Sequence, residues 1–276
     1  MYKINFQEPI HIHFIGIGGI SMSGLAEILF EEHFTISGSD SKESELTRHL
    51  EHMGMQIFYG QKASNIIEGI DLIVYTAAIR EDNPEFAAAK EKGIPMLSRA
   101  ELLGQIMDNY QNSIAVSGTH GKTTTTSMIS QILLAAKKDP TITVGGILKA
   151  INGNLRVGKS DVFISEACEY TNSFLNFRPK YSIILNIEAE HLDFFKDIHD
   201  IRNSFHLFAK NTKENGAIII NGEIEDYQEI VEGLAPQVIT YGMSDACDFY
   251  PADITFNEKA CAGFTAMYHG EKVMDV

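Results

Sequence analysis

Two glycine-rich segments, each between a strand-like apolar run and a helix-like run, constrain the fold of this chain more than any other feature. They are Gly16-Ile17-Gly18-Gly19-Ile20-Ser21 and Gly118-Thr119-His120-Gly121-Lys122-Thr123-Thr124. Glycines let the backbone turn tightly, so that N–H groups and a helix N-terminus can approach a phosphate group. Two such turns predict two α/β units, each with a phosphate-binding loop at the end of a strand.

Strand and helix patterns alternate along the rest of the chain, which is typical of a parallel sheet with helices on both faces. In the first unit we expect strands at residues 10–16, 34–38, 71–75 and 95–98, and helices at 20–32, 43–53, 84–92 and 99–107. In the second we expect strands at 113–117, 162–165, 181–186 and 217–221, helices at 122–137 and 201–210, and short strands from 238 to 276. The predicted fold class is α/β, with a Rossmann-like domain followed by a P-loop-type domain.

The polar stretch at residues 108–112 is the best candidate for a linker. It divides the 276 residues into predicted domains at 1–110 and 111–276, which are ordinary domain sizes. The chain stops inside a run typical of a strand, at residues 271–276. We therefore expect the second domain to be incomplete and the chain to be cut from a longer protein.

Charge and cysteine content exclude several classes of protein. The formal net charge is −15, which does not suit binding to a nucleic-acid backbone or to an anionic membrane. Anionic small molecules stay possible, because a nest of backbone N–H groups can bind phosphate within a negative protein. The three cysteines are widely spaced, and no signal-peptide core or membrane-spanning run is present. We expect a cytoplasmic protein with neither nucleic acid nor membrane as a partner.

The first loop lies where a dinucleotide-binding fingerprint belongs. Asp40 follows Gly16 by 24 residues, near the end of the next strand, where a carboxylate can bind a ribose hydroxyl. Ser21 stands where the last glycine of that fingerprint would be. From these residues alone the loop predicts a diphosphate ligand, with an NAD-dependent oxidoreductase as the first hypothesis and a plain tight turn as the alternative.

The second loop matches the back half of a P-loop, with Gly-Lys-Thr after a glycine-rich turn, although Val116 stands where the first glycine belongs. Backbone N–H groups would cradle the phosphates, and Lys122 would reach the β and γ oxygens. The Thr123 hydroxyl would bind Mg²⁺. These residues predict an ATP site, and a threonine-rich helix start is the alternative.

Two acidic or imidazole groups follow buried strands of the second unit, namely Glu166 and, within residues 186–193, His191. Because the C-terminal ends of parallel strands meet at one edge of a sheet, we expect both beside the phosphate loop. They are candidate Mg²⁺ ligands, although Mg²⁺ prefers oxygen. Weaker candidates, most of which we expect to be solvated, are Glu169, Glu188, Glu190 and Asp193.

Three further residues have a structural and a functional interpretation. Cys168 has no evident base partner, so we expect a small buried thiol rather than a nucleophile. His11 and His13 alternate on one strand and so share a face, which is compatible with a metal pair. Because no third ligand is evident, we interpret them as partly buried structural histidines.

Two nucleotide loops in two successive α/β units resemble the Mur ligases, the ATP-dependent amide-forming ligases of peptidoglycan synthesis. The resemblance is carried by HFIGIGGISMSGLAEIL at 13–29, SGSD at 37–40, YTAAIREDNPE at 75–85, SGTHGKTTTTSMI at 117–129 and LNIEAEHLDFF at 185–195. Within the family, residues 16–24 and the segment DNPE at 82–85 favour the member that joins L-alanine to UDP-N-acetylmuramate over the member that recycles murein peptide. A non-catalytic nucleotide-binding module stays as a rival class.

The resemblance implies roles for individual residues. The UDP-sugar would contact Gly16, Ile17, Gly18, Gly19, Ser39, Asp40, Thr76 and Ala77. ATP would contact Gly118, Thr119, His120, Gly121, Lys122, Thr123 and Thr124. Thr123, Glu166 and His191 would hold Mg²⁺, and the catalytic residues would be Lys122, His191 and Glu166.

The resemblance also implies a reaction through an acyl phosphate, with the L-alanine site mainly on a third domain that this chain lacks. We therefore expect the chain alone to turn over poorly. The run EACEY at 166–170 departs from the family's more common EADES. This departure keeps Glu166 in register and leaves the acids after it less certain.

Overall fold

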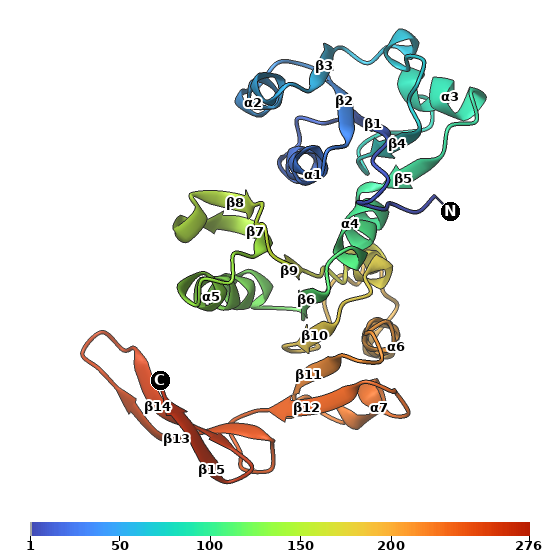
Figure 1. Ribbon diagram of the computed structural model, residues 1–276. Coiled ribbons are helices and arrows are strands. Elements are labelled where there is room, and N and C mark those ends of the chain that lie inside the picture. Colours follow the sequence, from blue (N-terminus) through green and yellow to red (C-terminus); the bar gives the residue numbers. More distant parts are fainter. Residues whose placement is uncertain (1) are drawn as a thin grey trace.

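The alternation of apolar strands and amphipathic helices produces two sheets in the computed structural model, which describes residues 2–276 (Figure 1). The first sheet has five parallel strands in the order β3-β2-β1-β4-β5. Its elements are β1 (His11–Ile15), α1 (Ile20–Glu31), β2 (Thr35–Asp40), α2 (Glu45–Met53), β3 (Gln56–Tyr59), the 3-10 turn η1 (Ala63–Asn65), β4 (Leu72–Tyr75), α3 (Pro84–Glu91), β5 (Met96–Ser98) and α4 (Arg99–Asp108). The strand order reverses at β1, and ligands of such sheets bind at the carboxyl ends of the strands beside that point.

The alternating side chains of β1 cover both faces of this sheet. Ile12 and Phe14 are fully buried in a large apolar cluster that also contains residues of α1 and α4. Ile15 points to the other face, into a smaller cluster with Ile73 and, from α3, Ala89. Helices therefore cover both faces, as the alternation of patterns predicts.

The helices of the first unit begin at residues that cap them, with one exception. Ser44 and Ser98 each form a capping box, at α2 and α4, and Asn83 caps α3 just before a proline. At α1 the N-cap residue is Gly19, which offers no side-chain hydrogen bond. The first N–H groups of α1 therefore lack a side-chain cap at the edge of the sheet where a ligand would bind.

The second sheet has ten strands in the order β15-β14-β13-β12-β11-β10-β6-β9-β7-β8. Its elements are β6 (Asn112–Ser117), α5 (Lys122–Ala135), β7 (Thr141–Leu148), η2 (Lys149–Ile151), β8 (Gly153–Arg156), β9 (Val162–Glu166), η3 (Tyr170–Asn176), β10 (Tyr181–Ile184), α6 (Ile198–Lys210), β11 (Ala217–Asn221), α7 (Gln228–Val231), β12 (Gln237–Tyr241), β13 (Phe249–Phe256), β14 (Ala262–Tyr268) and β15 (Glu271–Asp275). The central pairs are parallel, whereas β7–β8, β13–β14 and β14–β15 are antiparallel. The sheet is mixed, so the expectation of a parallel sheet holds only for its centre.

The strands expected from apolar runs are present, and their ends differ from the predicted ones by no more than two residues. The antiparallel strands from β13 to β15 form an extension that projects away from the rest of the second unit (Figure 1). Sequence analysis missed β3, β7 and β8, which contain polar or glycine residues and are only partly buried. Among residues 2–276 no helix is long and apolar enough to cross a membrane.

The two units pack against each other through the segment expected to be a linker. Asp108 ends α4 and Asn112 begins β6, so only three residues connect these elements. Between them, the Tyr110 ring lies 5.0 Å from the ring of Phe163 in the second unit, centroid to centroid. The Tyr110 hydroxyl donates a hydrogen bond to Thr141 at 3.2 Å, and burial raises the pKa of Tyr110 to about 12. The polar stretch is thus a packed junction, and the domain boundary near residue 110 stays a prediction.

The two histidines of β1 share one hydrogen-bond partner in this fold. Ring nitrogens of His11 and His13 lie 2.8 and 2.9 Å from the same hydroxyl, that of Ser37. His13 is fully buried, and burial lowers its pKa to about 4. Burial also lowers the pKa of the half-buried His11. One group of potential metal ligands is found among residues 2–276, and it lies elsewhere.

The buried imidazole of His13 should make the protein less stable as the pH falls. Its folded-state pKa of about 4 lies below the unfolded value of 6.5, so the unfolded chain takes up a proton first. The stability that depends on neutral His13 is complete above pH 6.5 and is lost as the pH falls toward 4, by about 3 kcal/mol in all. Unfolding free energies at about pH 7.5 and about pH 5 should therefore differ less in His13→Gln than in the wild type.

The exposed His52 provides the control for this measurement. His52→Gln removes an exposed side chain of α2, so the difference in unfolding free energy between the two pH values should stay close to that of the wild type. An equally steep loss of stability in His13→Gln would contradict the assignment.

Replacing Gly104 by alanine should lower the free energy of unfolding, although alanine favours helices. Gly104 lies where α4 packs on η3, and a Cβ atom there would lie 2.1 Å from the backbone oxygen of Asn176. Relieving that overlap costs about 1–3 kcal/mol, which exceeds the roughly 1 kcal/mol that alanine gains over glycine in a helix. Urea denaturation measures the difference. Gly153→Ala is the control, since the atoms nearest to its added Cβ are 3.9 Å away; equal stability of the two variants would contradict this packing argument.

Candidate functional site

The second glycine-rich loop begins at the carboxyl end of β6, which lies between β9 and β10 in the sheet. Gly118 and Gly121 have φ angles of 141° and 83°, a region that favours glycine. A Cβ atom at Gly118 would also lie 2.9 Å from the Leu185 side chain. Gly121 is the N-cap of α5 and makes no side-chain cap. The first N–H groups of α5 are therefore not capped by a side chain and can bind an anion.

Asn186, just after β10, holds this loop in shape. Its side chain accepts a hydrogen bond from the His120 N–H at 2.7 Å and donates one to the His120 carbonyl at 3.1 Å. Its backbone carbonyl accepts the Thr119 N–H at 3.2 Å, and the Thr119 hydroxyl accepts the Glu188 N–H at 2.9 Å. Thr119 and His120 thus contribute to the loop's shape, and sequence analysis did not single out Asn186.

Lys122, the first residue of α5, folds back over the loop. Its ammonium donates to the carbonyls of Gly118 at 2.5 Å and Thr119 at 3.1 Å. It also contacts both carboxylate oxygens of Glu169, at 3.2 and 2.9 Å. Only 3% of the Glu169 side chain is exposed, against 16% of the Lys122 side chain. Glu169 is therefore the exception among the acids that we expected to be mostly solvated.

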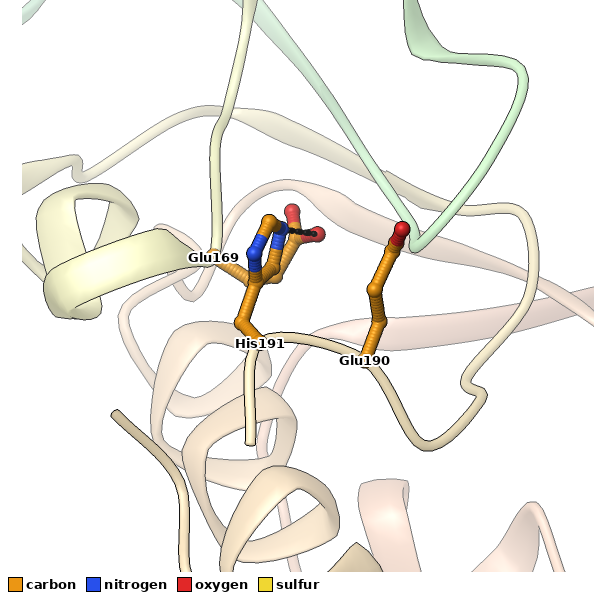
Figure 2. A group of neighbouring side chains, drawn as sticks. All are labelled: Glu169, Glu190 and His191. Carbon is orange, nitrogen blue, oxygen red and sulfur yellow. Dashed lines mark ion pairs between the residues drawn. The ribbon is translucent and has the colours of Figure 1, made fainter. Parts of the chain in front are cut away.

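His191 approaches the same buried carboxylate from the segment after β10. Its Nε2 atom lies 3.6 Å from Glu169 Oε1, and the side chain of Glu190, the residue before His191, lies on the same side of the loop (Figure 2). One possible ligand atom from each of the three residues lies within 4.8 Å of the others. The Tyr170 ring lies 4.7 Å from the His191 ring, and its hydroxyl donates to Asp193 at 2.9 Å. Glu188, Glu190 and Asp193 are exposed, as expected.

Thr123 and Glu166 form a second pair of possible metal ligands. The Thr123 hydroxyl donates to Glu166 Oε2 at 3.1 Å, and the Gly145 N–H donates to Oε1 at 2.5 Å. A hydroxyl and a carboxylate at the edge of a phosphate loop are the oxygen donors that Mg²⁺ prefers. The three predicted metal ligands thus fall into two groups, with Thr123 and Glu166 in one and His191, beside the buried Glu169, in the other.

The first glycine-rich loop is closed by internal hydrogen bonds. The N–H groups of Gly16 and Ile17 both donate to the Ser39 carbonyl at 2.9 Å. The Gly18 N–H donates to Asp40 Oδ2 at 2.9 Å, so the Asp40 carboxylate holds the loop closed. Gly16 has a φ angle of 85°, and a Cβ atom there would lie 2.8 Å from Thr76 Cγ2. Gly16 therefore lets the ends of β1 and β4 approach closely.

The other residues predicted to bind the UDP-sugar differ in their accessibility. Ile17 and Ser39 are fully buried, and the Ser39 hydroxyl donates to the buried Glu85 at 2.5 Å. Thr76 is half-buried, whereas Gly19 and Ala77 are exposed. Ile17 and Ser39 therefore shape the loop from inside, and the exposed residues form its surface.

A cavity of about 340 Å³ lies between the two units, within the size range of sites for small molecules. From the first unit it is lined by Ser21 and Arg99, among others, and from the second by Glu166 and Cys168. Cys168 is exposed, so the expectation of a buried thiol is wrong. Partial desolvation nevertheless raises the pKa of this thiol. Sequence analysis did not single out Arg99, because nothing in its local pattern shows that it faces the second unit.

Comparison with protein families explains why both loops occur in one chain. The family model described as "Mur ligase family, catalytic domain" matches residues 11–111. The model described as "Mur ligase middle domain" matches residues 116–274. The chain belongs to the Mur ligase family. Because both loops fall within these matches, the hypothesis of an NAD-dependent oxidoreductase is wrong.

Individual Mur ligases are similar over the whole chain. The UDP-N-acetylmuramate–L-alanine ligase of Agathobacter rectalis is 73% identical over 276 residues, which are 100% of this chain and 60% of that protein. The chain thus spans about 60% of the length of the curated relatives it matches.

Solved Mur ligases also share the fold. The UDP-N-acetylmuramate:L-alanyl-γ-D-glutamyl-meso-diaminopimelate ligase of Neisseria meningitides matches with a TM-score of 0.83 and 27% identity, over 98% of this chain and 87% of that one. The UDP-N-acetylmuramate–alanine ligase of Thermotoga maritima matches with a TM-score of 0.76 and 29% identity, over 97% and 60%. These matches confirm the predicted α/β fold and the resemblance found in the sequence.

Glu169→Gln should destabilise this Mur ligase chain, because it leaves the partly buried Lys122 without its counter-charge. We expect the free energy of unfolding to fall by up to about 3 kcal/mol, the lower end of the range for a broken buried pair. Urea denaturation of Glu169→Gln, Lys122→Met and the double variant forms a cycle, in which the double variant should lose less than the sum of the two single losses.

The control for this cycle is Glu188→Gln. The Glu188 side chain is 62% exposed and lies 3.6 Å from His120, so its loss should stay within about 0.5 kcal/mol. Additive effects of Glu169→Gln and Lys122→Met would show that the two side chains do not act as a pair.

Proposed function

We propose that this chain contributes the sugar-nucleotide and ATP sites of an ATP-dependent ligase that joins L-alanine to UDP-N-acetylmuramate in the cytoplasm. The observation that carries the proposal is the cavity between the two units, which is lined by the first turn of α1 and by Glu166 beside the P-loop-type loop. A sugar nucleotide bound to the first unit could extend toward ATP bound to the second. The 73% identity to the Agathobacter rectalis ligase supports L-alanine as the amino acid.

On the ATP side, the uncapped N-terminus of α5 and the Lys122 ammonium would bind the phosphates. Lys122 contacts Glu169 and the loop carbonyls. A bound triphosphate would replace some of these contacts of the Lys122 ammonium, and Glu169 would keep the ammonium close to the loop. The reaction brings a carboxylate toward a triphosphate, so a fixed positive charge lowers the barrier by electrostatic stabilisation.

The donor set beside the loop fits Mg²⁺. The hydroxyl of Thr123 and the carboxylate of Glu166 would hold the ion, and His191 with Glu169 forms a second set of possible ligands. When bound, Mg²⁺ would screen the phosphate charges and polarise the γ-phosphoryl group. The hydrogen bond from Thr123 orients Glu166 toward the loop.

On the sugar side, the first turn of α1 would bind the diphosphate. The N–H groups of Gly16, Ile17 and Gly18 are less suited to this role, because they donate hydrogen bonds to residues 39 and 40. The substrate carboxylate oxygen would attack the γ-phosphorus, forming an acyl phosphate and releasing ADP. The amine of L-alanine would then attack the acyl carbon and release phosphate. Holding both reactants in one cavity supplies much of the rate acceleration through positioning.

The 276-residue chain should bind Mg-ATP, and Lys122→Ala should weaken this binding. A charge-assisted contact to phosphate corresponds to a loss of about 10- to 100-fold in affinity. Calorimetric titration measures it. Lys138→Ala is the control, because Lys138 is exposed just beyond the other end of α5. Failure of the wild type to bind Mg-ATP, or equal binding by Lys122→Ala, would contradict the proposed ATP site.

The choice of amino acid is tested by turnover. We expect little ADP release from this chain alone and restored release after fusion to the part of the Agathobacter rectalis ligase that it does not match. L-alanine should stimulate ADP release by the fusion, whereas L-alanyl-γ-D-glutamyl-meso-diaminopimelate should not. Stimulation by the tripeptide alone would favour the recycling ligase, which is the second candidate function because of the similarity to the Neisseria meningitides structure. Binding of Mg-ATP with no ligase activity in the fusion would favour a non-catalytic module.

A further inference from the structure

The cavity between the two units has an unusual charge distribution for a site that would receive anionic ligands. Among residues 2–276, the charged side chains that line it are one cation, Arg99, and one anion, Glu166. The remaining lining residues are apolar or neutral. In a chain with a formal net charge of −15, a substrate anion entering this cavity meets the Glu166 carboxylate and needs a nearby positive charge.

Arg99 is held in place by the residue that departs from the dinucleotide fingerprint. It is the first residue of α4, and its guanidinium donates a hydrogen bond to the Ser21 hydroxyl at 3.1 Å. Ser21 lies in the first turn of α1 and is exposed toward the cavity that both residues line. A glycine at position 21 would offer no acceptor. The serine thus directs the guanidinium across the first turn of α1.

The second unit contributes the other charged group of the cavity. Glu166 ends β9 and accepts a hydrogen bond from Thr123, the second residue of α5. Arg99 from the first unit and Glu166 from the second unit therefore line one cavity.

We propose that Arg99, oriented by Ser21, binds an anionic group of the sugar nucleotide and so acts as a recognition residue contributed by the first unit. This inference rests on the proposed function, because it takes a sugar nucleotide as the occupant of the cavity. The guanidinium offers several N–H donors in a planar fork, which suits the oxygen pairs of either a carboxylate or a diphosphate. Its half-buried position beside apolar lining residues strengthens such a contact relative to one in water.

The test measures binding of UDP-N-acetylmuramate and UDP-N-acetylglucosamine to the 276-residue chain by calorimetry. Both ligands have the diphosphate, and only the first has a carboxylate. Arg99→Gln should weaken the binding of UDP-N-acetylmuramate by about 10- to 100-fold, and Arg99→Lys should weaken this binding less. A loss confined to UDP-N-acetylmuramate assigns Arg99 to the carboxylate, and equal losses for both ligands assign it to the diphosphate.

Ser21→Ala tests the orienting role. Introduced into the wild-type chain, it should weaken the binding of UDP-N-acetylmuramate by a smaller factor than Arg99→Gln does. Introduced into the Arg99→Gln chain, it should have no further effect on binding, since the two residues act as one unit. Arg178→Gln is the matched control, because Arg178 is exposed and lines a different hollow with Lys3 and Lys213. Urea denaturation and Mg-ATP binding should be unchanged in Arg99→Gln.

Unchanged sugar-nucleotide binding in Arg99→Gln, with a wild type that binds, would overturn the assignment of Arg99 and leave the proposed function intact. An equal loss of Mg-ATP binding would also overturn it, because it would indicate a general structural effect. If the wild type bound neither sugar nucleotide, the proposed function and the role of Arg99 would fail together.

Discussion

Under the proposed function, the central constraint on this chain is that a strongly acidic protein has to bind anionic ligands. With a formal net charge of −15, long-range electrostatics oppose such ligands, so attraction has to come from groups that the fold places locally. The two sheets do this with helix N-termini that lack a side-chain cap, at α1 and α5. Each of these helix starts has one cation beside it, Arg99 near α1 and Lys122 at α5.

The cation of the ATP side is held by an acid, which has consequences for both stability and binding. Lys122 is neutralised by the buried Glu169 and in addition bonds to two loop carbonyls. Burying this pair carries a desolvation cost, and the pair fixes the ammonium above the loop before any ligand arrives. A preorganised charge loses less on binding than one on a free side chain, because its rotamer entropy has already been lost. The same carboxylate also contacts His191, so one buried acid orients two candidate functional residues.

The local sequence was sufficient to predict most helices, strands and loops. It was not sufficient to predict which side chains from distant segments contact one another. The loops at Gly16 and Gly118 could be located because glycine, an apolar strand and a helix start follow one another directly in the chain. Glu169 looked like a solvated acid, because only the folded chain brings it to Lys122, 47 residues earlier in the sequence. Arg99 was missed for the same reason, since its partner Ser21 is 78 residues away. Polar strands such as β8 were not predicted, because a half-buried strand has no continuous apolar run in its sequence.

Close contacts join the two units beside the cavity. Tyr110 packs on Phe163 across the junction, and Gly104 of α4 leaves no room for a Cβ atom against η3. The helix α4 begins with Arg99 and packs on η3. The residue directly before η3 is Glu169, which orients Lys122. The backbone at residues 99 and 122 is therefore linked through the packing of α4 on η3 and through the ion pair of Glu169 with Lys122. Under the proposed function, a ligand that spans both units would meet one cation from each unit.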